Sequence, residues 1–123
     1  MNASKKNVVM AAVAGALLLG ATAHVMAAAV DKEIFDGWKL YKRERCETCH
    51  GPTAEGAAAF PNLVNSLKTI SKDKFVETVI NGSAKGMPPY KDNKKVVEGV
   101  DNLYQFVKGR SDGTVPPGEL ESK

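Results

Sequence analysis

The stretch Cys46-Glu47-Thr48-Cys49-His50 decides what this chain folds around, because two thiols three residues apart with a histidine beside them are typical of c-type haem attachment. In a helix, this spacing places both sulfur atoms on one face within a single turn, where they can reach the two vinyl groups of one porphyrin. His50 is then positioned to approach the iron. We therefore predict one covalently attached haem c.

Other uses of the two cysteines are weaker interpretations. An exported protein can also place two cysteines in a disulfide or in a thioredoxin-like redox pair. The redox pair is expected at the start of a helix in a βαβ context, and no strand-like alternation follows residue 27. A zinc site is disfavoured because Cys46, Cys49 and His50 are too closely spaced to supply three tetrahedral ligands, and no second cluster of Cys or His exists.

Residues 1–27 are predicted to be a signal peptide that is removed. Lys5 and Lys6 give a positive start, residues 8–23 form an apolar run, and small residues follow near Ala27. Cleavage after Ala27 is the first expectation and cleavage after Ala29 the second. The alternative is an uncleaved anchor, but a membrane span needs about 20 apolar residues and this run is shorter. We expect a periplasmic protein without stable membrane insertion.

The remaining 96 residues suffice for one small domain. A core of this size gives only marginal stability by itself, and a large flat apolar cofactor adds buried apolar surface to it. Loss of Lys5 and Lys6 lowers the formal net charge from +3 to +1, because all 14 acidic residues lie after the leader. Nothing in this charge balance indicates nucleic-acid binding.

The spacing of apolar residues predicts an all-α fold. An amphipathic helix is expected over residues 31–45, and a second begins with Ser71 as its N-cap and stops at Asn81-Gly82. The third helix carries apolar residues at steps of three and four from Val96 to Val107. The segments 51–62 and 82–95 are rich in Gly, Pro or Ala and are predicted loops. We expect a domain over residues 28–110 and a flexible C-terminal tail over 111–123.

The choice of axial iron ligands is narrow, because residues 28–123 contain a single histidine, His50, and a single methionine, Met87. Met87 lies in a loop next to two prolines, where a flexible core-filling residue is out of place. The second ring nitrogen of His50 needs an acceptor, and we expect the carbonyl of Pro61 to provide it. Ligation by Met and His raises the potential relative to two histidines and closes the iron to small ligands. This favours electron transfer over catalysis.

With these residues in place, the chain resembles the class I c-type cytochromes. The resemblance implies a small cytochrome c fold with three to five helices around one haem, in which the first and last helices cross at Gly37 and Tyr104. It also implies that His50 donates to the carbonyl of Pro61 and that Met87 is the distal ligand. The matching segments are Gly37 to Tyr41, Cys46 to Gly51, Pro61-Asn62-Leu63, Met87-Pro88 and Val100 to Lys108.

Residues Leu103 to Gly113 are similar to the end of small periplasmic cytochromes that serve quinoprotein alcohol dehydrogenases. This resemblance implies a pyrroloquinoline-quinone (PQQ) methanol or ethanol dehydrogenase as electron donor and an acceptor toward a terminal oxidase or another cytochrome. The segment from Thr114 to Lys123 departs from that pattern.

Two alternatives to a free electron carrier remain open. One is a haem protein that binds small ligands or acts like a peroxidase, and the other is a permanent cytochrome subunit of a dehydrogenase. Basic residues flank both ligand segments and are candidates for a partner-docking ring around the haem edge, with an ordinary solvated surface as the competing interpretation. The docking candidates are Lys42, Arg43, Lys85 and Lys91.

Overall fold

A computed structural model describes residues 26–123 together with positions 15 and 20. The predicted signal peptide therefore lies almost entirely outside the described residues. The described chain contains five helices and two short strands. Their order is β1 (Ala28–Val30), α1 (Lys32–Arg43), α2 (Glu47–His50), α3 (Leu63–Ser66), α4 (Lys72–Asn81), α5 (Lys94–Asp112) and β2 (Leu120–Ser122).

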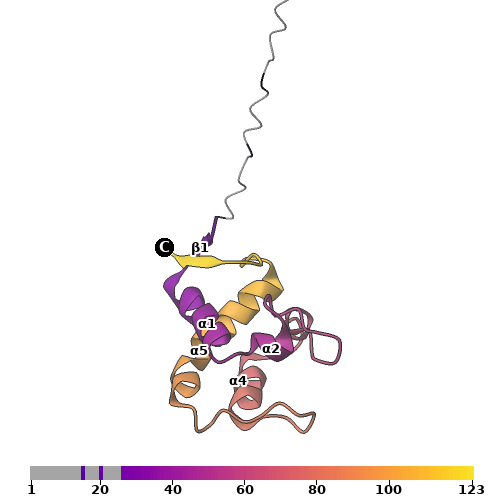
Figure 1. Ribbon diagram of the computed structural model, residues 1–123. Coiled ribbons are helices and arrows are strands. Elements are labelled where there is room, and N and C mark those ends of the chain that lie inside the picture. The colour runs from indigo at the N-terminus through magenta and orange to yellow at the C-terminus, as the bar shows by residue number, and fades with distance from the viewer. Residues whose placement is uncertain (1–14, 16–19, 21–25) are drawn as a thin grey trace, which may run out of the picture.

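Helices α1 and α5 form the largest contact between elements and cross near the middle of the molecule (Figure 1). The close approach depends on Gly37, where an added Cβ would lie 2.0 Å from the backbone oxygen of Asn102. The same two helices also meet through the rings of Tyr41 and Phe106, which pack edge to face with centroids 5.3 Å apart. The predicted crossing of the first and last helices is therefore present.

The crossing point needs one correction. The atoms nearest to Gly37 belong to Asn102 and Leu103, and not to Tyr104. Tyr104 instead packs against α4, where its ring centroid lies 5.5 Å from that of Phe75. Asn102 and Tyr104 contact different helices because residues two positions apart point to different sides of a helix.

The caps of α4 and α5 follow from their sequences. Ser71 begins α4 by accepting a hydrogen bond from the backbone N–H of Lys74 at 3.2 Å, and the helix stops at Asn81 as predicted. Asn93 begins α5 in the same way, with its side-chain oxygen 3.2 Å from the N–H of Val96. The last helix runs to Asp112 and therefore ends two residues beyond the predicted domain boundary at residue 110.

A two-stranded parallel sheet is the feature that the sequence did not predict. Strand β1 pairs with β2, with Ala28 opposite Leu120 and Val30 opposite Ser122. Figure 1 places this sheet at one end of the molecule, beyond α1 and α5. Three-residue strands are too short to give a recognisable alternation of polar and apolar residues. The fold class is nevertheless all-α, because helices build the core.

The C-terminal segment corrects the expectation of a flexible tail over residues 111–123. Val115 and Leu120 are only 1% and 4% exposed. Arg110 is buried and donates from Nη1 to the carbonyl of Val115 at 2.8 Å, from Nε to the carbonyl of Thr53 at 3.0 Å, and from Nη2 to Glu55 at 3.1 Å. The packed unit therefore extends to the C-terminal strand. In the described part of the chain, no helix has the length and apolar character needed to cross a membrane.

Candidate haem site

The attachment segment follows directly from the end of α1. Arg45 adopts the left-handed conformation with φ +60°. The N–H of Arg45 donates to the carbonyl of Lys42 at 3.1 Å, and the N–H of Cys46 donates to that of Tyr41 at 3.0 Å. These two bonds form a Schellman turn, which satisfies the last carbonyls of α1. The turn leads the chain without a linker into the one-turn helix α2, which presents Cys49 and His50.

His50 is oriented by the loop that follows it. Its Nδ1 lies 3.2 Å from the carbonyl oxygen of Pro61, the contact that the sequence predicts. Because a carbonyl only accepts, Nδ1 carries the proton and Nε2 keeps its lone pair for a metal. The loop stays close to α2 because the N–H of Gly56 donates to the carbonyl of His50 at 2.7 Å. Gly51 permits this approach, since a Cβ there would lie 2.8 Å from the oxygen of Gly56.

Met87 is held by the backbone of its own loop. The N–H of Ser83 donates to the carbonyl of Met87 at 3.0 Å, and the N–H of Met87 points to the hydroxyl of Ser83 at 3.4 Å. Gly82 allows the carbonyl to approach, because a Cβ there would lie 2.5 Å from it. The N–H of Tyr90 donates to the carbonyl of Ile80 at 3.1 Å. The loop therefore returns to the end of α4 on both sides of Met87.

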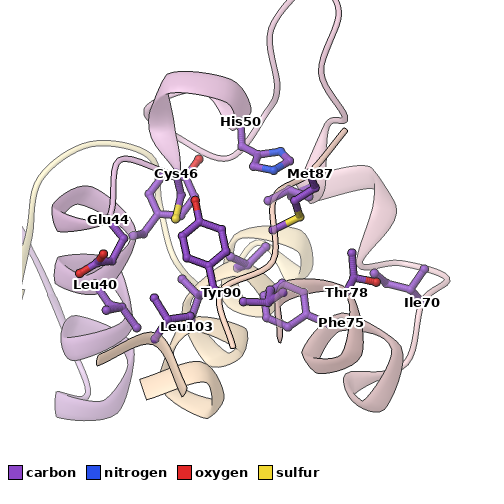
Figure 2. A pocket seen from close by; sticks show the side chains of 15 residues that line it. Leu40, Glu44, Cys46, His50, Ile70, Phe75, Thr78, Met87, Tyr90 and Leu103 are labelled. Atoms are coloured by element: carbon purple, nitrogen blue, oxygen red, sulfur yellow. The ribbon is translucent and has the colours of Figure 1, made fainter. Parts of the chain in front are cut away.

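Three of the four expected haem residues, Cys46, His50 and Met87, line one pocket. Cys49 lies in α2, three residues after Cys46, and is not part of the lining. Figure 2 shows the side chains of His50 and Met87 entering the pocket from two different segments. The pocket holds about 610 Å³ of space not filled by protein, counting its open mouth. Its mostly apolar walls, with the Cys46 thiol, the His50 imidazole and the Met87 thioether among them and Cys49 close by in sequence, fit a c-type haem. The lining residues are Leu40, Tyr41, Glu44, Cys46, His50, Leu63, Ile70, Phe75, Thr78, Val79, Met87, Tyr90, Val96, Leu103 and Val107.

Comparison with known proteins agrees with this site. A family of sequences described as "Cytochrome C oxidase, cbb3-type, subunit III" matches residues 32–107. Cytochrome c-555 of Methylococcus capsulatus is 57% identical over 118 residues, which cover 95% of this chain and 95% of that relative. The chain is a class I c-type cytochrome. As a member of this family, the cytochrome carries covalently attached haem c and is an electron carrier, not an enzyme.

Two further relatives are similar over part of their length. Cytochrome c-553I of Paracoccus denitrificans is 33% identical over 97 residues, which are 73% of this cytochrome and 42% of that protein. The crystal structure of the c-type cytochrome XoxG from Methylobacterium extorquens AM1 has the same fold, with a TM-score of 0.68 and 33% identity. The matched region covers 78% of this cytochrome and 63% of the XoxG chain.

Burial beside the pocket disfavours charge on the Cys46 thiol and the Tyr41 hydroxyl. Burial raises the pKa of the Cys46 thiol to about 11, so the unattached thiol is neutral at physiological pH. Burial also raises the pKa of Tyr41, whose hydroxyl donates to the carbonyl of Gly51. A redox-active cysteine pair requires the opposite, a lowered thiol pKa. This environment suits neutral thioether bonds better than thiolate chemistry.

The four docking candidates do not share one environment. Lys42 pairs with Glu119 at 3.1 Å and lies over the ring of Trp38, and Arg43 approaches Glu44 at 3.5 Å. Lys85 and Lys91 flank Met87, are exposed, and have no carboxylate within 4.0 Å among the described residues. Only the second pair therefore offers unengaged charge beside the Met87 loop.

Three polar residues at the site were not found from the sequence. Glu44 lines the pocket, and the side-chain amide of Asn93 donates to the Glu44 carboxylate at 2.7 Å. Outside the pocket, Arg110 connects the loop after α2 to the C-terminal segment. Charged residues in an amphipathic helix normally face water, so the sequence assigns Glu44 and Arg110 to the surface. The one available signal is Asn93, because an asparagine directly before an apolar helical pattern indicates an N-cap.

Proposed function

We propose that this cytochrome carries single electrons with Cys46 and Cys49 as haem attachment points and His50 and Met87 as axial ligands. The observation that carries this proposal is that His50 and Met87, the single histidine and the single methionine of residues 28–123, enter the same apolar pocket. The haem supplies the one-electron iron couple when bound.

Contacts within the chain hold the two proposed iron ligands in place. The Pro61 carbonyl keeps the proton of His50 on Nδ1 and fixes the plane of the ring. Ser83 and Gly82 fix the backbone of Met87 and so limit the positions that its sulfur can reach. A ligand set that need not rearrange is what rapid electron transfer requires, because little reorganisation then accompanies each step.

Two alternative functions have less support. A peroxidase-like or gas-binding protein needs a histidine or arginine on the distal side to act as an acid or to control ligand entry, and the described lining contains no Arg and no second His. A permanent dehydrogenase subunit has no direct support, although the family description refers to a subunit of another redox complex, an oxidase. Gel filtration of the native extract separates the cases, because a carrier elutes as a small protein and a subunit elutes with its complex.

We infer that the donor is a PQQ-dependent methanol or ethanol dehydrogenase and that the acceptor is a terminal oxidase or another cytochrome. The support is the similarity of Leu103 to Gly113 to cytochromes that serve such dehydrogenases. Mixing oxidised cytochrome with the purified dehydrogenase and its alcohol tests this directly. The haem should be reduced within the turnover time of the dehydrogenase, and absence of reduction would remove this donor.

We also infer that the mature cytochrome is periplasmic and begins at Ala28. Strand β1 begins at this residue, so cleavage after Ala27 preserves the whole strand, whereas cleavage after Ala29 removes two of its three residues. N-terminal sequencing of the purified holoprotein should therefore read Ala-Ala-Val-Asp. An intact Met1 on a membrane-bound haem protein would contradict the cleavage.

Docking to the donor is expected to depend on salt through Lys85 and Lys91. Exposed charges at an interface rim act mainly on association and are screened over about 10 Å at 0.1 M salt. The bimolecular rate of reduction should therefore fall as salt rises. The double variant Lys85→Glu and Lys91→Glu should be slower at low salt and should show a flatter or reversed dependence in stopped-flow experiments.

Lys42→Glu is a single charge reversal at a lysine that already pairs with Glu119 at 3.1 Å. It should change the salt dependence less than the single variant Lys91→Glu does. A wild-type rate that is indifferent to salt would mean that docking is apolar and that Lys85 and Lys91 only solvate the surface. Melting temperatures of the wild type and all three variants show whether a rate change reflects docking alone.

A further inference from the structure

Glu44 is the single carboxylate among the described residues that line the haem pocket. It lies directly after α1, and Figure 2 shows it on the same side of the pocket as Leu40 and Cys46. Its side chain is only 16% exposed. Its apolar stem lines the pocket, and Figure 2 shows the carboxylate oxygens turned away from the pocket interior. A largely buried carboxylate needs partners, because removing its charge from water is costly.

Two partners offset that cost. The Asn93 side-chain amide donates from Nδ2 to one carboxylate oxygen at 2.7 Å, and Nε of Arg43 lies 3.5 Å from the other oxygen. Asn93 is itself fixed, because its Oδ1 accepts from the N–H of Val96 and its own N–H donates to the carbonyl of Tyr90. Asn93 thereby joins the end of α1, the start of α5 and the segment after Met87.

Several charged groups near Glu44 act against the electrostatic effect of its carboxylate on the pocket. Arg43 is 56% exposed, so water screens much of its charge. A shallow surface cleft on the other side of Glu44 is lined by Asp92, Lys94 and Lys95, all exposed, and Lys94 is engaged with Glu98 at 3.7 Å. The N-terminus of α5 adds a partial positive charge through Asn93. These groups oppose the effect of the carboxylate on the pocket, but each of the cations is more than half exposed or lies at the exposed surface, and the helix terminus carries only a partial charge.

We propose that Glu44, held in place by Asn93, lowers the reduction potential of the haem and is a tuning residue of this cytochrome. An anion beside a weakly polarisable pocket stabilises the oxidised centre, which carries one more positive charge than the reduced centre. One electron enters from the donor and leaves to the acceptor. This inference rests on the proposed function, because it requires the haem in this pocket.

Glu44→Gln in the holoprotein tests the proposal. Glutamine keeps an oxygen for the Asn93 amide and removes only the charge. Spectroelectrochemical titration should show a higher potential, with the equilibrium constant for reduction raised about tenfold, which equals about 59 mV for one electron. Asp92→Asn is the matched control, because it removes one exposed negative charge from the same cleft. A shift no larger than that of Asp92→Asn, or a shift downward, would overturn the proposal.

Asn93→Ser tests the positioning role separately. Serine retains the N-cap oxygen for α5 but is too short to keep the amide bond to Glu44. The freed carboxylate should turn toward water, which should raise the potential less than Glu44→Gln does. Adding Asn93→Ser to Glu44→Gln should produce no further rise, because the effect of Asn93 passes through Glu44. If Glu44→Gln does not incorporate haem, an unchanged potential in Asn93→Ser would still overturn the proposal.

The near-infrared sulfur-to-iron band distinguishes failure of this proposal from failure of the proposed ligation. A band in the wild type and in both variants shows that Met87 remains bound, so any change in potential belongs to the electrostatic effect. Absence of the band in the wild type would instead overturn Met87 as a ligand, whatever Glu44 does.

Discussion

Met87→Ala is expected to abolish the near-infrared sulfur-to-iron band and to lower the reduction potential, because the thioether is the ligand that raises the potential relative to nitrogen donors. The iron should then bind added imidazole or carbon monoxide, which the intact ligand set excludes. The structure supports a large effect, since no second methionine or histidine lies within residues 28–123 to replace Met87. Absorption spectra and a redox titration measure both changes.

Met87→His is the matched variant, because it keeps a ligand at the same backbone position. The iron of this variant should remain six-coordinate and should not bind added ligands. The sulfur-to-iron band should be absent, and the reduction potential should be lower than in the wild type. Lys85 and Lys91 lie close in sequence and are the competing ligands. An unchanged spectrum in Met87→Ala would show that one of them, or another group, occupies the sixth position.

The second large effect is expected at Gly37. Even the single methyl group of Gly37→Ala would lie 2.0 Å from the oxygen and 2.5 Å from the carbonyl carbon of Asn102. Backbone atoms within a helix cannot move aside without separating α1 from α5. We therefore expect a loss of about 3 kcal/mol or more in the free energy of unfolding, which lowers the Tm by more than about 10 °C.

Gly99→Ala is the matched control in the same helix pair. An added Cβ at Gly99 would meet the side-chain methyl Cδ2 of Leu40 at 2.8 Å, and a side chain can adopt another rotamer. Alanine also favours the helix by about 1 kcal/mol relative to glycine, which offsets part of the repacking cost. Thermal unfolding of the holoproteins should place Gly99→Ala within about 1 kcal/mol of the wild type. Equal stabilities of the two variants would show that the crossing does not depend on Gly37.

Most of the haem site could be predicted from the sequence, because its components are local or unique. The attachment residues Cys46, Cys49 and His50 are adjacent, so their relative placement needs only one turn of helix. Met87 is singled out by composition, and the helix bounded by Ser71 and Asn81 carries its own start and stop residues. Each of these features depends on neighbours a few positions away, which is the range over which a sequence pattern is informative.

The tertiary structure alone decided the features that join distant segments. Strand β1 pairs with β2, Arg110 contacts Thr53 and Glu55, and Glu44 meets Asn93 across 49 positions of sequence. Each contact is worth little until the chain has closed the loop between its partners, and the residue types involved are equally common on a solvated surface. The sequence by itself therefore determined the cofactor and the candidate ligands. Only packing decided that the C-terminal segment is buried against the helices and that Glu44, paired with Asn93, lies in the wall of the haem pocket.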